Sequence, residues 1–415
     1  MRPALVASGG VLSGCVLAWA LRGDQTSAIP AHLLVWGTAF TAYLVALHAS
    51  RGISSSGLAL GLGVGLLWRV VLVAAPPLLS DDVNRYVWEG RIQLHGGNPY
   101  AWLDRPDAER WISLRDGIWQ GINHKNYTAV YPPFWQMTAA AVVFLRDSIA
   151  AMKAFLVACE IAAGFVLARL LARGGLPRER LLILAWSPLA LVEIAGSGHN
   201  EPFGMLLMAL ALLALEAGRP LLSALAGALA FQAKFVPGLL MAGWVRRYRP
   251  WHLLGAGLLA ASLVIPYAGA GPGLSRSLSS YGQYWRFNET LFVALEWLTG
   301  PVQAPRLAAL LVLALAFRLA AARVEPATAG LATTVGLLIL APSVFPWYAL
   351  WLLPWLVLRE SAGALLFTGT VGLAYLVYPD WRAGGAWQVG WPLRALEYGP
   401  CLAVGAVSFL RRPAA

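Results

Sequence analysis

Charged residues are scarce in this chain of 415 residues. Asp, Glu, Lys and Arg together make up only 12% of it, against ~25% in ordinary soluble domains, and 59% of the residues are hydrophobic. This composition excludes a water-soluble protein. The apolar residues come in runs of roughly 17 to 25, the length that a helix needs to cross a ~30 Å hydrocarbon core. The sequence therefore predicts an all-α, polytopic membrane protein with about twelve to fourteen transmembrane helices.

Cysteine and lysine are also rare. The three cysteines, Cys15, Cys159 and Cys401, lie within apolar segments and lack the paired spacing of a disulfide framework or a zinc site. We expect neither a disulfide nor a thiolate metal site. Only three lysines occur beside 28 arginines, so a lysine inside an apolar run, such as Lys234, is unusual for this chain.

The apolar runs predict where the chain crosses the membrane. The expected segments are 3–21, 31–49, 58–79, 149–172, 181–197, 201–218, 220–245, 251–268, 304–322, 327–342, 346–358, 361–378 and 392–410. The first run ends in Ala18-Trp19-Ala20, like a signal-peptide cleavage site, but it is long for a signal core, so we interpret it as a span. Pro237 and Pro346 predict breaks, which the membrane tolerates only where protein or a water-filled cavity surrounds the backbone.

The net charge of +11 would indicate a nucleic-acid partner in a soluble chain, but membrane topology explains it here, and we expect no nucleic-acid binding. With the N-terminus inside, the inner connections collect fifteen arginines and four glutamates, as the positive-inside rule requires. Residues 80–148 then form an outer loop within a single domain, 1–415. Residues 133–146 are too short for a span, and we expect an interfacial helix there.

Two adjacent carboxylates, Asp81 and Asp82, open this loop directly after an apolar span. Like charges at such range raise the pKa of one member, and partial burial raises it further. A carboxylate with a raised pKa is a useful proton acceptor near neutral pH. The alternative is structural: one Asp caps the helix that begins at Val83, and the other meets Arg85 or solvent.

Two proline-containing bends follow in the loop, one around Asn98-Pro99-Tyr100 and one from Asn123 to Pro133. Loop architecture is the leading interpretation of Asn98 and Tyr100. His124 and Lys125 present cations that could hold a phosphate, although solvated surface charge explains them equally well.

Polar residues recur at three further outer positions: His199-Asn200-Glu201, Lys234 and Trp285-Arg286. Polar groups that converge at one membrane depth are costly unless they serve a site. His199 and Glu201 could bind a metal, but a hydrogen-bonded structural cluster is the preferred interpretation. The ammonium of Lys234, at a helix break, suits a phosphate, with snorkelling to the interface as the alternative.

Aromatic and charged residues within or next to the predicted spans also need an interpretation. Trp347 and Tyr348 lie at an outer break, where a flat ring could stack on a sugar or a prenyl chain, although aromatic residues also collect at both membrane interfaces for other reasons. Arg69 lies near the middle of a span, and we expect Glu160 to be its acidic partner.

Several of these residues together resemble a known family, the bacterial polyprenyl-phosphate-dependent mannosyltransferases of the GT-C superfamily. The resemblance covers residues 80 to about 358. The residues that carry it are Ser80-Asp81-Asp82, Arg85-Tyr86, Trp88-Glu89-Gly90-Arg91, Gly97-Asn98-Pro99-Tyr100, Tyr131-Pro132-Pro133, Gly198-His199-Asn200, Ala233-Lys234, Pro237, Trp285-Arg286-Phe287-Asn288 and Pro346-Trp347-Tyr348.

The resemblance implies a GT-C fold whose first large outer loop supplies a catalytic Asp. In relatives this Asp stands in an Asp-x-x-Arg-Tyr pattern, which falls on Asp82, with Asp81 as the second choice. It also implies an inverting transfer of a hexose, most simply mannose, from a polyprenyl-phosphate sugar to a glycan or glycolipid hydroxyl. Three positions depart from the family pattern: Glu89, Glu201 and Phe345.

A chemical scheme follows from the residues and the resemblance together. A carboxylate accepts the proton of the acceptor hydroxyl, and cations hold the leaving phosphate. We assign the base to Asp82. The expected phosphate ligands are Arg85, His199, Lys234 and Arg286. The remaining expected substrate contacts are Tyr86, Asn98, Tyr100, Asn200, Glu201, Trp285, Trp347 and Tyr348.

The expected setting is the cytoplasmic membrane of a bacterium, with the site facing outside and the lipid bilayer as a partner. No cofactor is required; a divalent metal is compatible with the scheme. The main rival is a transporter or flippase for lipid-linked sugars, which should place ionisable groups near the bilayer midplane in two related halves. An envelope glycan polymerase or ligase is a third interpretation.

Overall fold

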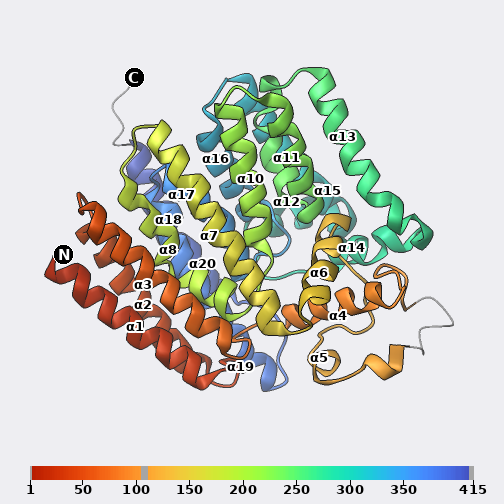
Figure 1. Ribbon diagram of the computed structural model, residues 1–415, viewed down its shortest axis with the longest axis horizontal. Helices are drawn as coiled ribbons and strands as arrows, with labels where there is room; N and C mark the ends of the chain where they lie inside the picture. Colours follow the sequence, from red (N-terminus) through yellow and green to blue (C-terminus); the bar gives the residue numbers. More distant parts are fainter. Residues whose placement is uncertain (1, 104–110, 411–415) are drawn as a thin grey trace.

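The protein is a bundle of helices (Figure 1). The structure, a computed structural model, describes residues 2–103 and 111–410. It is 77% helical, and no strand forms among the residues it describes. The prediction of an all-α, polytopic membrane protein is confirmed.

Seven helical segments in the described part of the chain are long and apolar enough to cross a membrane. They are α1 (Pro3–Arg22), α2 (Ile29–Ala49), α3 (Ser55–Ala74), α7 (Ile149–Arg173), α13 with η5 (Pro250–Ala270), α15 (Leu291–Ala321) and α18 to α19 (Ala362–Arg382). An eighth is added if the bent pair Pro188–Gly196 and Glu201–Glu216, which turns by 117°, forms one span.

Four shorter apolar helical segments add to these spans. They are α6 (Pro133–Leu145), α11 (Pro220–Ala233), α16 (Pro326–Leu340) and η6 with α17 (Pro346–Leu358). A helix over the expected range 133–146 is confirmed by α6, while its interfacial position and the count of twelve to fourteen crossings stay predictions.

The remaining elements connect or continue these helices. They are α4 (Asp82–Leu94), α5 (Gly117–Gln120), η2 (Arg178–Leu181), α8 (Leu182–Ala185), α9 (Pro188–Ala190), η3 (Leu191–Gly196), α10 (Glu201–Glu216), α12 (Val236–Ala242), η4 (Val245–Arg247), η5 (Ile265–Ala270), α14 (Gly273–Tyr284), η6 (Pro346–Leu352), α17 (Leu353–Leu358), α18 (Ala362–Thr370), η7 (Val371–Leu376), α19 (Val377–Arg382) and α20 (Trp391–Leu410).

Three predicted boundaries need correction. α3 ends at Ala74 and not at 79, because two prolines follow from Pro76. The expected span 181–197 is not one helix: it breaks before Pro188 and continues as a π-helix. α15 begins at Leu291, earlier than the expected 304, and bends at Gly300, whose φ of 78° is accessible to glycine.

The predicted break at Lys234 is confirmed. α11 ends at Ala233, Lys234 is extended at φ −159° and ψ 140°, and α12 begins at Val236. Such irregular backbone needs protein around it at membrane depth. Lys234 is accordingly buried, with 9% of its surface exposed.

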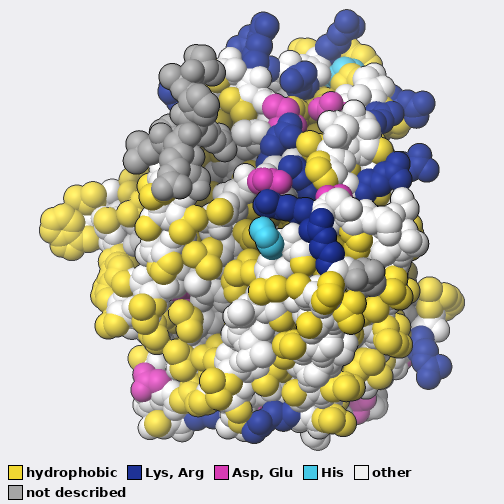
Figure 2. All heavy atoms as spheres, turned by 90° about the vertical axis from the view of Figure 1, so that its left-hand side faces the viewer, with side chains coloured by type: hydrophobic (Ala, Val, Ile, Leu, Met, Phe, Trp, Pro, Cys, Tyr) yellow, Lys and Arg dark blue, Asp and Glu magenta, His cyan; other side chains and the backbone are white. Residues whose placement is uncertain are grey.

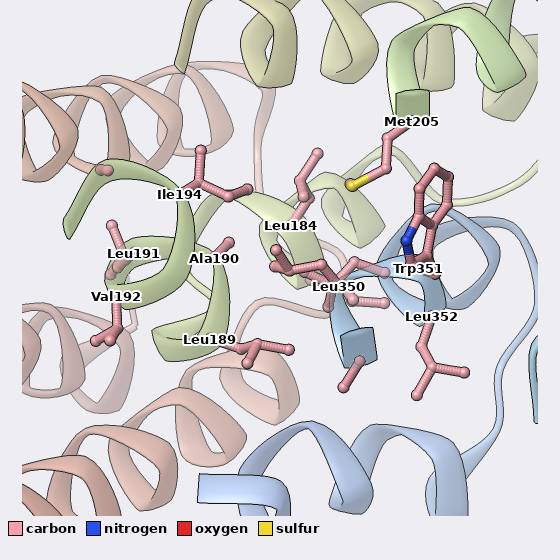
Figure 3. Close-up of a cluster of buried hydrophobic side chains, with 14 of the residues drawn as sticks. Leu184, Leu189, Ala190, Leu191, Val192, Ile194, Met205, Leu350, Trp351 and Leu352 are labelled. Atoms are coloured by element: carbon pink, nitrogen blue, oxygen red, sulfur yellow. The ribbon is translucent and has the colours of Figure 1, made fainter. Parts of the chain in front are cut away.

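The broken segments pack together in the interior. Figure 3 shows side chains of η3 and the preceding α9, such as Leu189 and Ile194, close to Met205 of α10 and Leu350 of η6. All four side chains are fully buried. The irregular helices therefore lie in the interior, and buried residues of the regular spans, such as Leu12 and Leu156, complete the core.

The expected pairing of Arg69 with Glu160 is confirmed. Arg69 Nε and Nη2 donate to the two Glu160 oxygens at 2.7 and 2.5 Å. Arg69 Nη1 also donates to the Ala185 carbonyl at 2.7 Å. This buried pair ties α3 to α7 and to the end of α8.

The flanks of the bundle, which face away from its interior, are apolar. Leu21, Leu34 and Leu67, on α1, α2 and α3, are 86%, 75% and 60% exposed. Figure 2 shows a broad hydrophobic surface on this side of the molecule, with most Lys and Arg side chains above it. This distribution is typical of a protein that contacts lipid through its flanks.

Candidate active site

The two loop carboxylates share one amide. Asn123 Nδ2 donates to Asp81 Oδ1 at 2.6 Å and to Asp82 Oδ1 at 3.0 Å. Asp81 stands at the N-cap position of α4, but its side chain makes no capping hydrogen bond. The capping interpretation of this side chain is therefore wrong, and the pair is held from the opposite side of the loop.

The environment of Asp81 favours its protonated form. More than a third of the residue is open to solvent, yet the surrounding protein removes much of its hydration. This desolvation, followed by the negative charge of Asp82, raises the pKa of Asp81 to about 6. The hydrogen bond from Asn123 acts in the opposite direction and lowers it.

Arg85 holds the loop segment that carries Asn123. Arg85 Nη2 donates to the carbonyls of Asn123 at 2.5 Å and His124 at 2.9 Å, and Nη1 donates to the Tyr127 carbonyl at 3.0 Å. The guanidinium also lies 3.7 Å from Glu89 Oε1. Since these contacts occupy a buried guanidinium, they favour a positioning role over the predicted phosphate contact for Arg85.

His199 faces Asp82. His199 Nε2 lies 3.9 Å from Asp82 Oδ2, which is too long for a hydrogen bond. On its other side, Nδ1 lies 3.1 Å from the Glu193 carbonyl and 3.2 Å from Glu193 Oε2. Nδ1 can donate to Glu193, and a second proton on Nε2 would make that atom a donor toward Asp82. Tyr375 donates to Glu193 Oε1 at 2.6 Å and fixes that carboxylate.

Lys234 joins the two residues that follow His199. Its Nζ donates to Asn200 Oδ1 at 3.0 Å and to Glu201 Oε1. Nζ also lies 5.3 Å from the centre of the Tyr131 ring and 5.7 Å from that of Tyr348. An ammonium carries three N–H donors, so one remains for a ligand.

Two tyrosines, Tyr86 and Tyr131, connect this group of polar residues to α4. The Tyr86 and Tyr131 hydroxyls lie 3.2 Å apart, and Tyr86 stands one helical turn after Asp82. Burial, and then the neighbouring Tyr86, Asp82 and Glu201, raise the pKa of Tyr131 well above its usual value. Asp82, His199, Glu201, Lys234, Tyr131 and Tyr86 thus surround one region.

Three consecutive residues of this group present buried polar atoms without a hydrogen-bond partner among the described residues. These atoms are His199 Nε2, Asn200 Nδ2 and Glu201 Oε2. An unpaired buried polar atom costs about 1–3 kcal/mol, so three in succession need an explanation. A bound polar ligand would satisfy them.

Aromatic rings form the border of the region. Trp347 stacks on His199, with ring centres 4.1 Å apart, and its other face stacks on Phe345 at 4.5 Å. The Tyr281 and Tyr348 hydroxyls share a hydrogen bond. The ring centres of Trp285 and His124 lie 5.1 Å apart. Trp285 also packs against Tyr281 and so connects the loop to α14.

Three predicted substrate residues have other contacts. Asn98 Nδ2 donates to the Tyr267 carbonyl at 3.2 Å, and the Tyr100 hydroxyl donates to the Tyr131 carbonyl at 2.6 Å, as expected of loop architecture. Arg286 Nε donates to Glu296 Oε1 at 2.8 Å. These contacts direct Arg286 to α15 and do not join it to Lys234.

Two residues of the region were not assigned a site role from the sequence. Asn123 was predicted only as the start of a bend, and Glu193, within the expected span 181–197, was given no role in the site. An ionisable residue inside the membrane is a functional hypothesis by default, and this signal could have selected Glu193. Nothing local to Asn123 indicates that it reaches two carboxylates.

His199 and Glu201, for which a metal site was the alternative interpretation, are not part of a larger group of metal-binding side chains among the described residues. Among residues 2–103 and 111–410, no group of three or more His, Cys, Asp or Glu side chains could hold a metal ion. His199 and Glu201 lie one residue apart, but Glu201 pairs with Lys234. The three cysteines are free and buried.

Comparison with known proteins identifies the family. No curated protein and no solved structure matches the chain. The family model described as "Alpha-(1->6)-mannopyranosyltransferase, N-terminal domain" matches residues 3–247, more than half of the chain. The match includes the loop carboxylates, His199 and Lys234, and the prediction of a mannosyltransferase is confirmed. The chain belongs to the alpha-(1->6)-mannopyranosyltransferase family.

Proposed function

We propose that the protein transfers mannose from a polyprenyl-phosphate donor to a hydroxyl of a glycan or glycolipid acceptor, with inversion at the anomeric carbon. One observation carries the proposal: the unpaired buried atoms of His199, Asn200 and Glu201 lie beside the Asp82 carboxylate. The acceptor hydroxyl is the proposed partner of His199 Nε2, the leaving phosphate accepts from Asn200 Nδ2, and a hydroxyl of the sugar donates to Glu201 Oε2.

Asp82 is the proposed base. A hydroxyl group fits between Asp82 Oδ2 and His199 Nε2, which lie 3.9 Å apart: it donates its hydrogen to Asp82 and accepts one from the Nε2–H of a protonated imidazole. The acceptor O–H bond breaks as its proton passes to Asp82. The same oxygen bonds to the anomeric carbon while the bond from that carbon to the phosphate oxygen breaks.

Lys234 is the proposed ligand of the leaving phosphate. Its remaining N–H, together with the unpaired Asn200 Nδ2, supplies two donors for the charge that develops on the phosphate oxygen. Trp347, stacked between His199 and Phe345, holds the imidazole in place beside Asp82 and leaves no free ring face for the predicted stacking on a sugar. Arg286 is less suited to bind the leaving phosphate, because Glu296 already binds it.

A lipid-linked donor and an outward-facing site are further parts of the proposal. The distribution of arginines predicts that the loop with Asp81 and Asp82 lies on the outer side of a bacterial cytoplasmic membrane. Nucleotide sugars are cytosolic substrates, whereas a polyprenyl phosphate carries its sugar within the bilayer. Membership of a mannosyltransferase family favours this function over a flippase.

Transfer by the purified protein tests the donor. Proteoliposomes are given radiolabelled polyprenyl-phosphate mannose or a nucleotide-linked mannose, with an oligomannoside acceptor. We expect label to reach the acceptor only from the lipid donor, with the opposite anomeric configuration. Transfer from the nucleotide sugar alone, or retention of configuration, would contradict the proposal.

A further inference from the structure

A second polar region lies at the other end of the bundle from α4 and α5, where α13 begins and the α15–α16 turn lies (Figure 1). A cavity of about 310 Å³ opens there between η4, α15 and α16. Its lining includes Arg246, Arg247 and Arg323, together with Trp244 and Pro326. None of these residues belongs to the candidate active site.

The three arginines have no counter-charge. Their guanidinium groups make no hydrogen bond or ion pair with any residue between 2 and 103 or 111 and 410. The nearest acid along the chain is Glu325, but its Oε2 accepts from Arg359 Nε at 3.0 Å and caps α16 through the Thr328 N–H at 2.9 Å. Three positive charges therefore surround one cavity without neutralisation.

Packing and a hydrogen bond hold two of the lining residues, Trp244 and Pro326, in place. Trp244 is buried and donates from Nε1 to the Pro326 carbonyl at 3.0 Å, which ties the end of α12 to the start of α16. Arg323 has a φ of 55°, in the left-handed region where glycine is usual after a helix. The chain thus places an arginine where a glycine would be less strained, and this arginine lines the cavity.

α15, which contributes Ala320 to the cavity and ends next to Arg323, also carries exposed apolar side chains. Leu310 and Phe317, seven residues apart on one face of α15, are 62% and 49% exposed. Acyl chains could lie along this face while a headgroup occupies the cavity, whose volume is at the small end of ligand pockets, ~300–1,000 Å³. Basic pockets between transmembrane helices on the cytoplasmic side are typical headgroup sites.

We propose that this cavity binds the phosphodiester headgroup of an anionic phospholipid, at the membrane face opposite to the candidate active site. Arg246, Arg247 and Arg323 hold the phosphate, and the exposed face of α15 contacts the acyl chains. The inference does not depend on the transfer chemistry, since no residue is shared.

Lipid binding by the full-length protein in detergent tests this site. Phosphatidylglycerol and phosphatidylcholine with identical chains are titrated, and bound lipid is counted by native mass spectrometry. One variant carries Arg246→Gln, Arg247→Gln and Arg323→Gln. A matched control carries Arg169→Gln, Arg173→Gln and Arg178→Gln, which removes the same charge from exposed arginines at the end of α7 and in η2.

We expect wild type and control to prefer phosphatidylglycerol, and the cavity variant to bind it roughly tenfold or more weakly. Both variants should keep the wild-type elution volume and unfolding midpoint, because all six side chains are exposed. Equal loss in the control would overturn the proposal, since it would indicate net charge alone. Saturable binding of inorganic phosphate without a preference between the two lipids would overturn the lipid assignment.

Discussion

Asn123 connects the two carboxylates at the start of the loop. Its amide has two N–H groups, and each goes to a different carboxylate. Arg85 fixes its carbonyl at 2.5 Å, so the amide is held from behind. Asn123 therefore orients the proposed base, and we expect it to matter for turnover more than for substrate binding.

Asn123→Ala should lower kcat by roughly tenfold or more and leave KM within about twofold, because the carboxylates lose their orientation and not the substrate contacts. Steady-state transfer kinetics check this. Asn126→Ala, at an exposed position of the same segment, is the matched control. Equal kinetics of the two variants would contradict a positioning role.

The acid limb of the pH profile reports on Asp81. Its pKa of about 6 means that it takes up a proton as the pH falls through this value. The pair then loses a negative charge that favours proton transfer to Asp82, so kcat/KM should fall below pH ~6. The limb should vanish in Asp81→Asn. Because the Asn123 hydrogen bond lowers the pKa of Asp81, the limb should move to higher pH in Asn123→Ala.

At the scale of helices, close backbone contacts explain why certain glycines are needed. A Cβ at Gly65 of α3 would lie 2.7 Å from the Ala185 carbonyl oxygen, which also accepts from Arg69. Gly65→Ala should destabilise the protein by about 1–3 kcal/mol. Gly63→Ala, two residues away with nothing within 4 Å, should be neutral or slightly stabilising. Unfolding midpoints in detergent compare them; equal midpoints would exclude this packing.

The buried ion pair between α3 and α7 gives a second prediction at this scale. Glu160→Gln leaves the Arg69 guanidinium without its counter-charge, and should cost about 3–5 kcal/mol of stability. Replacing both partners, Arg69→Met with Glu160→Met, should restore much of this loss, because no unpaired charge remains. A double variant as unstable as the single one would contradict the pairing as the cause.

Helix boundaries show what the sequence can predict at this scale and what it cannot. The break at Lys234 was predictable because Pro237 cannot continue a helix. The π-helix over Leu191–Gly196 was not predictable, since its apolar sequence suits a straight span equally well. Arg286 was assigned to the site from its polar segment; its pairing with Glu296 was not predictable, because the expected span began at 304, whereas α15 begins at Leu291 and includes Glu296.

At the scale of the whole molecule, the fold class was predictable. The thickness of the membrane sets the length of a spanning helix, and apolar runs of this length are rare in other kinds of protein. Asp82 and His199 lie more than a hundred residues apart in the chain, and their approach depends on α7, against which both α4 and η3 pack. Sequence motifs identified both residues, but the distance between them is a property of the assembled bundle.

The molecule also separates two kinds of polar chemistry. Carboxylates and tyrosines gather around the start of α4, whereas the cavity near η4 is lined by arginines that pair with no residue in the described part of the chain. This polarity agrees with an outward-facing transfer site and an inward-facing basic surface.

The turnover of Asp82→Asn shows whether Asp82 accepts the proton of the acceptor hydroxyl. The asparagine keeps the shape of the side chain but cannot accept the proton of the acceptor hydroxyl. In mannosyl transfer from polyprenyl-phosphate mannose, we predict that kcat falls by roughly 10²–10⁴-fold while the unfolding midpoint stays that of wild type. A correctly folded Asp82→Asn protein with wild-type kcat would contradict the account.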